Sequence, residues 1–169
     1  MAEEIINRIA NSKLITVDLE DYYPKGKRVV LDIKDWLFHE IILKEKDFRT
    51  HLTNHDWQQY QDCYVALHCS SDAIIPSWAY LLITSKLVPF AKETVVGTLE
   101  LLETVIYTRI INSLDTTEFT QKPVIIKGCS NKPIPPTAYI QLIQKIQLVA
   151  KTVMFGEACS TVPLYKATK

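Results

Sequence analysis

The spacing of apolar and polar residues divides the chain into a short first part and a longer part in which strands alternate with helices. In the first part, residues 14–19 and 28–33 have the alternation typical of strands, and they flank a turn at residues 23–26. This arrangement predicts an N-terminal antiparallel hairpin. Helical spacing predicts a short helix over residues 2–11 and another over residues 44–52.

From residue 64 onward, apolar runs of strand length alternate with segments of helix length. Strands of this kind joined by helices predict Rossmann-like βαβ units and a mostly parallel sheet with right-handed crossovers. The expected fold class is therefore α/β, as a single domain over residues 1–169, with an extension at 1–60 and a βαβ core at 61–169. The expected core strands are 64–67, 94–97, 124–127 and 152–156, and the expected helices are 76–88, 99–114 and 137–149.

Two segments of the core resemble each other. Residues 69–77 align without a gap with residues 129–137, and after a one-residue deletion residues 91–97 match residues 150–156. The offset is 60 at the cysteines (129 − 69) and 59 at the glycines (156 − 97). This pattern predicts an internal duplication of 63–100 and 123–159, with Glu100 opposite Cys159. The alternative is that any two βα units look alike at low stringency.

Composition and charge narrow the function. With 169 residues, of which 47% are hydrophobic, the chain can bury a sizeable core. Nineteen basic residues balance nineteen acidic ones without a dense basic run, so we do not expect nucleic acid as a partner, and the balance permits a homodimer. No apolar stretch approaches the ~20 residues of a membrane span, and the acidic start is unlike a signal peptide. We therefore expect a cytoplasmic protein without a membrane partner.

Three Cys-Ser pairs each follow an apolar run that predicts a strand. If those strands are parallel neighbours, the three thiols meet at one edge of the sheet, where α/β proteins bind their ligands. The serine after each cysteine can donate a hydrogen bond to sulfur and so support a bound cofactor. The pairs are Cys69-Ser70, Cys129-Ser130 and Cys159-Ser160.

Three thiols with one further position suit zinc or an iron-sulfur cluster. In a reducing cytosol, metal binding or nucleophilic chemistry is expected more than disulfides. The candidates for the remaining ligand are Glu100, Glu157 and His68, of which His68 is weakened by strand alternation, because neighbouring side chains point to opposite faces. The alternative for each cysteine is a buried packing role, which we expect for Cys63.

Two other functions compete with a metal site. The first is an enzyme that uses the thiolate of Cys129 as a nucleophile, with Lys132 nearby to favour the thiolate and His51 or His55 as the base. The second is a metal-free interaction module anchored by exposed aromatic residues, for which the tyrosines of the predicted hairpin turn are the best surface candidates.

Four segments of the chain form a recognisable set: LDIKDWLF (31–38), ILKEKDFR (42–49), KGCSNKP (127–133) and GEACSTVPLYK (156–166). These segments resemble an uncharacterised domain-of-unknown-function family common in Bacteroidetes. Members are often encoded near iron-sulfur cluster assembly genes of the sulfur-mobilisation type. The resemblance therefore implies an accessory role linked to cysteine chemistry and iron-sulfur assembly proteins as partners, and it implies no assigned activity.

Overall fold

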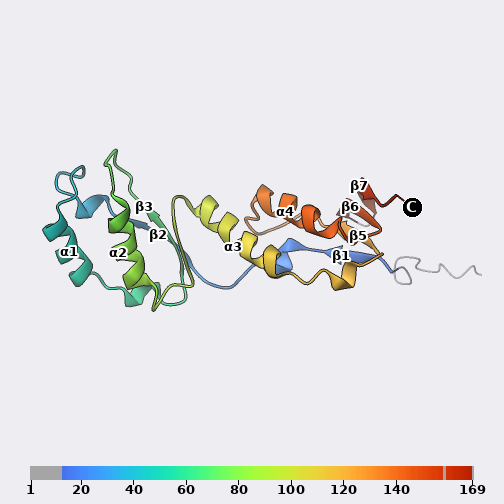
Figure 1. The fold of residues 1–169 in the computed structure, drawn as a ribbon, viewed down its shortest axis with the longest axis horizontal. Coiled ribbons are helices and arrows are strands. Elements are labelled where there is room, and N and C mark those ends of the chain that lie inside the picture. Colours follow the sequence, from blue (N-terminus) through green and yellow to red (C-terminus); the bar gives the residue numbers. More distant parts are fainter. Residues whose placement is uncertain (1–12, 158, 169) are drawn as a thin grey trace, which may run out of the picture. The chain divides into compact units, whose positions relative to one another are not determined.

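The computed structural model describes residues 13–157 and 159–168, and the chain divides into two compact units (Figure 1). Unit 1 comprises residues 1–23 and 107–169, and unit 2 is Pro24–Ile106. The helix α3, Leu99–Ser113, contains the boundary between them. The single-domain organisation expected from the sequence stays a prediction, and the expected helix at residues 2–11 lies outside the described residues.

Unit 2 contains a three-stranded sheet of β2 (Arg28–Asp32), β3 (Tyr64–His68) and β4 (Glu93–Val96). The strands lie in the order β2-β3-β4 and all pairs are parallel. Two helices, α1 (Glu45–Asn54) and α2 (Ser77–Leu87), pack on this sheet. Parallel pairing requires crossover connections, and α1 and α2 lie in them.

The core of unit 2 forms where one face of each helix meets the central strand. On α1, Phe48 and Leu52 are buried four residues apart, and on α2 the same spacing buries Ile83 and Leu87. These positions share one side of a helix, so the residues between them remain in contact with solvent.

Unit 1 contains the strands β1 (Ile15–Val17), β5 (Pro123–Ile126), β6 (Thr152–Glu157) and β7 (Ser160–Lys166). They lie in the order β1-β5-β6-β7; the first three are parallel and β7 returns antiparallel to β6. The helix α4, Pro136–Ile146, connects β5 to β6 and begins with proline, whose fixed φ suits the first helical turn. The core includes Val124, Leu142 and Tyr107.

The two units repeat the same backbone hydrogen bonds. Asp62 N–H donates to Phe90 O at 2.9 Å, and Gln121 N–H donates to Val149 O at 2.8 Å. The two donors are 59 residues apart in the chain (121 − 62), and so are the two acceptors (149 − 90). Asp62 and Gln121 also share a φ of 58°, an uncommon left-handed conformation for residues other than glycine. Short 3-10 helices precede both: η3 (Gln58–Tyr60) and η4 (Thr117–Phe119).

The same offset of 59 holds on both sides of the Cys-Ser loops. The N–H of Ala79 donates to Pro76 O, and the N–H of Ala138 donates to Pro135 O. The buried positions of the two helices match in the same way: Ala79, Ile83 and Leu87 on α2, and Ala138, Leu142 and Ile146 on α4. The offset of 60 that the sequence suggested at the cysteines is therefore wrong for the backbone: Cys69 stands opposite Gly128, one residue before Cys129.

The structure confirms the α/β class with mostly parallel pairing, and both N-terminal strands form. They do not form an antiparallel hairpin, because β1 pairs in parallel with β5 and β2 pairs in parallel with β3. The alternation of apolar and polar residues identifies each strand from its own residues. The strand with which it pairs lies more than 30 residues away in the chain, so the alternation does not indicate the pairing. Among the described residues, no helix is long and apolar enough to cross a membrane.

Candidate functional site

The carboxyl edge of the unit 1 sheet carries a charged cluster that begins with Asp18, the residue after β1. One carboxylate oxygen of Asp18 accepts a hydrogen bond from the Glu20 N–H at 2.9 Å, and the other accepts one from Lys127 Nζ at 2.7 Å. Burial opposes the charge on Asp18, but these hydrogen bonds outweigh it and hold the pKa of the carboxyl below its ordinary value. The bond to Asp18 likewise raises the pKa of Lys127.

Cys129 is exposed in the loop that follows β5. Glu20 holds this loop, because its carboxylate accepts hydrogen bonds from Ser130 Oγ at 3.3 Å and from the Asn131 N–H at 3.0 Å. Tyr139 on α4 adjoins the same edge. Burial raises the pKa of Tyr139, and the negative charges of Asp18, Cys129 and Glu20 raise it further. Cys129 therefore lies in an acidic environment that also contains a phenol.

Cys159 is exposed in the turn that joins β6 to β7. Glu157, the last residue of β6, pairs with Ser160, the first residue of β7. The charge of Glu157 contributes to the raised pKa of Lys127. Because β5 and β6 are parallel neighbours, Cys129 and Cys159 leave the same edge of one sheet.

Unit 2 has a similar edge around Asp32, the residue that ends β2. The Asp32 carboxylate accepts hydrogen bonds from the Lys34 N–H at 3.0 Å and from the Ser70 N–H at 3.1 Å. Burial opposes its charge, but these bonds, with help from His68, lower the pKa of Asp32 below its ordinary value. The sulfur of Cys69 lies 3.3 Å from the hydroxyl oxygen of Ser71.

The two edges share a plan. In each, an aspartate at the end of the first strand closes a short turn by accepting a hydrogen bond from the N–H two residues further on. In each, a cysteine follows the second strand and a tyrosine on the next helix lies near it: burial and the neighbouring cysteine raise the pKa of Tyr80, as they do for Tyr139. Each unit thus carries its own edge of thiol, carboxylate and phenol.

Comparison with known families assigns the chain to a group. Residues 3–167 match the family model described as a protein of unknown function, DUF2480. The chain belongs to this family. No curated protein and no solved structure matches the DUF2480 chain. Its chemistry must therefore be argued from its own residues.

The predicted metal ligands of the DUF2480 chain fall in both units. Cys129, Cys159 and Glu157 lie in unit 1, whereas Cys69 and Glu100 lie in unit 2, where Glu100 is exposed in the first turn of α3. No three histidine, cysteine, aspartate or glutamate side chains among residues 13–157 and 159–168 are grouped so as to hold a metal ion. Convergence of all three thiols stays a prediction.

The predicted supporting residues have mixed roles. Ser70 acts through its backbone N–H on Asp32, and the Ser130 hydroxyl contacts Glu20 and the carbonyl of Lys132. Ser160 is exposed at the start of β7. Lys132 Nζ lies 5.5 Å from the ring centre of Tyr23.

The two histidines proposed as bases belong to an aromatic cluster of unit 2. The His51 ring stacks on Trp36 with centroids 6.2 Å apart, and His55 Nε2 lies 2.8 Å from the Tyr60 hydroxyl. Burial lowers the pKa of His55 and raises the pKa of Tyr60 to about 12. Both histidine rings therefore pack against aromatic side chains of unit 2.

The sequence did not indicate the charged residues of the unit 1 edge, Asp18, Glu20 and Lys127, or the phenol of Tyr139. A signal was present in the chain: Val-Asp-Leu at 17–19 and Leu-Asp-Ile at 31–33 are similar strand ends. Both strand ends lie before residue 63, outside the two segments of the predicted repeat.

Proposed function

We propose that the protein binds a transition metal, zinc or the iron of an iron-sulfur cluster, through thiolates at the carboxyl edge of unit 1. Cys129 and Cys159 are the ligands in this proposal, and Glu157 supplies a carboxylate. The observation that carries it is that two free, exposed thiols follow neighbouring parallel strands of one sheet. Thiolates select zinc and iron-sulfur clusters over magnesium or calcium.

Metal binding would reorganise this edge. Zn–S bonds are about 2.3 Å long, and the described side chains are not grouped at such distances. Binding would therefore draw the β6–β7 turn toward the loop after β5, and the free energy of binding would stabilise the folded protein. Asp18 and Glu20 would add negative charge around the cation, which favours binding.

Metal analysis of the full chain, purified without oxygen, tests the proposal. Iron with sulfide and a brown colour would support a cluster, and colourless protein with stoichiometric zinc would support a mononuclear site. The metal-free protein titrated with Co²⁺ should develop thiolate-to-cobalt absorption. Cys129→Ser and Cys159→Ser should each abolish that absorption.

Cys69→Ser is the discriminating variant. Unchanged metal binding would support the unit 1 ligand set, and a loss equal to that of the other two variants would support the three-thiol set with Glu100 as a further candidate. Metal-free wild-type protein that binds no Co²⁺ would contradict both sets. An iron-sulfur cluster would in turn support the proposed accessory role beside iron-sulfur assembly proteins.

A second candidate is an enzyme with Cys129 as the nucleophile. The exposure of this thiol and the nearby phenol of Tyr139 favour it, and Lys132 follows three residues later in the same loop. Alkylation with iodoacetamide, followed by peptide mass mapping, should then label Cys129 faster than Cys159, which is also exposed, and Lys132→Met should slow the labelling of Cys129. Equal labelling rates would count against a specially activated thiol.

A further inference from the structure

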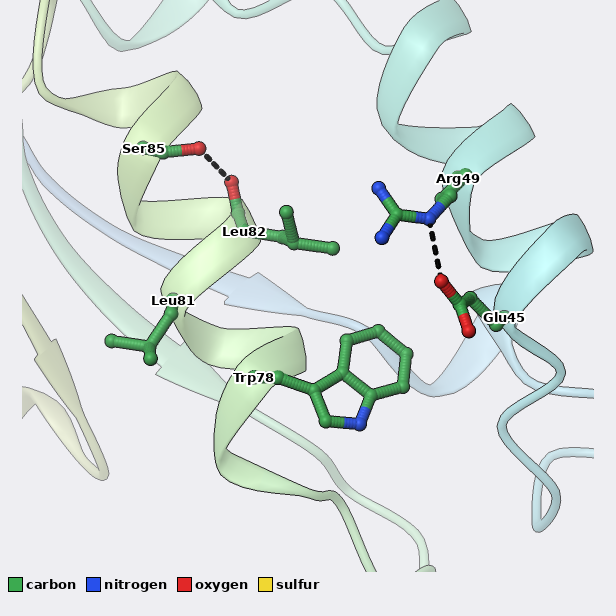
Figure 2. A pocket seen from close by; sticks show the side chains of 6 residues that line it. All are labelled: Glu45, Arg49, Trp78, Leu81, Leu82 and Ser85. Carbon is green, nitrogen blue, oxygen red and sulfur yellow. Dashed lines mark hydrogen bonds and ion pairs between the residues drawn. The ribbon is translucent and has the colours of Figure 1, made fainter.

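Unit 2 presents a hollow between α1 and α2, away from the thiol edges. Figure 2 shows the indole of Trp78, on α2, lying between that helix and the ion pair of Glu45 and Arg49 on α1. The hollow has a volume of about 390 Å³. Its walls are both apolar and charged, formed by Glu45, Arg49, Trp78, Leu81, Leu82 and Ser85.

A second hollow, of about 400 Å³, adjoins the first, because Trp78 lines both. Ile41, Ile42 and Ile74 line this second hollow, and Asp72 stands among them. The two hollows therefore form one surface centred on Trp78. We call it the Trp78 surface, and its large apolar members are Ile41, Ile42, Ile74, Trp78 and Leu81.

This surface exposes as much apolar area as the largest patches on monomeric proteins. The exposed fractions are 91% for Ile74, 68% for Leu81, 61% for Ile41, 52% for Ile42 and 37% for Trp78. With roughly 200 Å² for a fully exposed large side chain, these fractions amount to about 600 Å². That is the upper end of what monomers expose, and it approaches the ~800 Å² that each partner buries in a stable complex.

Unit 1 has no equivalent of this surface at the matching positions. With the offset of 59, Thr137 stands where unit 2 has Trp78, and Pro133 stands where it has Ile74. Ile140 on α4 matches Leu81 and is also exposed. The tryptophan and the exposed loop isoleucine are therefore additions particular to unit 2, and a shared βα framework does not account for them.

We propose that the Trp78 surface is a two-fold interface between two copies of this chain. A two-fold axis in the interface at Trp78 exchanges the two hollows, so the second hollow of one copy meets the first hollow of its partner. Asp72 then meets the Arg49 side chain of the other copy, and Ile74 faces Leu81. The charges of Asp72 and Arg49 are therefore complementary across the axis.

The centre of the interface is already ordered. The Trp78 ring packs edge-on against Phe48, with centroids 6.0 Å apart and an interplanar angle of 87°. An aromatic anchor held in place loses little conformational freedom on binding, and tryptophan is enriched among residues that dominate binding energy. The balanced charge of 19 acidic and 19 basic residues adds no net repulsion between copies.

Sedimentation velocity of the full chain under reducing conditions, from about 1 µM to about 100 µM, tests the interface. We expect a reversible dimer that Ile74→Asp and Leu81→Asp each weaken at least tenfold. Both side chains are exposed, so neither change should unfold the protein, and circular dichroism checks this. Ile140→Asp, at the matching exposed position of unit 1, should leave the dimer unchanged.

Charge reversal tests the two-fold geometry. Asp72→Arg and Arg49→Asp should each weaken the dimer several-fold, and the two changes in one chain should restore it. A wild-type protein that is monomeric at about 100 µM, or a dimer that Ile74→Asp and Leu81→Asp leave intact, would overturn the proposal. A monomer would also point to a different occupant, such as another protein. Metal content should be the same in Leu81→Asp and wild type, so the result is separable from the thiol site.

Discussion

Units 1 and 2 each contain three parallel strands in matching order, but the side chains at the carboxyl ends of these strands differ. The edge of unit 1 places Lys127 against Asp18 and has two exposed thiols, whereas the edge of unit 2 places His68 near Asp32 and has one half-buried thiol. Unit 2 instead carries the Trp78 surface. A common backbone therefore fixes where functional groups can stand, and a few side chains decide what each unit can do.

The units also differ in how they use buried charge. In unit 2, Arg28 Nε and Glu103 Oε1 are 2.5 Å apart and both side chains are nearly buried. In unit 1, the Lys127–Asp18 pair is partly exposed. The loss of one partner of a buried ion pair is costly, because the other charge stays buried without the ion pair that offset its burial. The two units should therefore respond differently to the loss of one partner.

The largest expected effect tests whether the two cores are equivalent. Ile83→Ala in unit 2 and Leu142→Ala in unit 1 remove fully buried side chains at matching helix positions. Each should lower the free energy of unfolding by about 2–5 kcal/mol. Urea denaturation followed by fluorescence measures both.

The number of transitions in the urea denaturation curves shows whether the two units unfold together. One cooperative transition, shifted equally by both variants, would support the single-domain prediction. Two transitions, each moved by only one of the variants, would show that the units unfold separately.

A smaller effect is expected from the buried ion pair of unit 2. Arg28→Ala leaves the Glu103 carboxylate buried and also removes the guanidinium donors to the carbonyls of Pro24 and Gly26. The expected loss of stability is roughly 3 kcal/mol. Lys127→Met in unit 1, the matched control, should cost about 1 kcal/mol or less because that pair is partly exposed. Equal losses would contradict the distinction between the two pairs.

The smallest effect concerns pH. Asp18 and Asp32 both have a lowered pKa in the folded protein. Each therefore adds stability at pH values above the unfolded pKa, and this stability is lost as the pH falls through the folded pKa. Asp18→Asn and Asp32→Asn should each flatten the fall in stability between about pH 5 and about pH 2.

Chemical denaturation at a series of pH values measures this slope. The matched control is Asp35→Asn, which changes an exposed aspartate of η2 (Lys34–Trp36) without the turn hydrogen bonds. A slope unchanged in both variants would show that these turns do not stabilise the ionised aspartates.

Much of the local structure could be predicted from the sequence. The strand expected at 64–67 is β3, Tyr64–His68, and the one expected at 152–156 is β6, Thr152–Glu157. Short apolar runs bounded by loops mark such buried strands. The antiparallel strand β7 was missed, because Pro163 and several exposed residues interrupt the strand pattern of residues 160–166.

The candidate site was less predictable. The Cys-Ser context predicts a site at Cys129 and Cys159, but the acidic residues Asp18 and Glu20 beside the Cys129 loop follow β1, more than 100 residues earlier in the chain. The internal duplication stays a prediction, and its sequence register differs by one residue from the backbone, because the Cys-Ser pairs recur at an offset of 60 and the backbone hydrogen bonds at 59.

The sequence by itself determined the α/β class, the βαβ core and the positions of the cysteines at strand ends, since these follow from local periodicity. Only the tertiary structure decided that the strands form two sheets and that β1 lies beside β5. Strand pairing joins residues such as Val17 and Ile126, which are far apart in the chain, and a local pattern of apolar residues contains no information about its partner. The division of the thiols between two units is a consequence of that pairing.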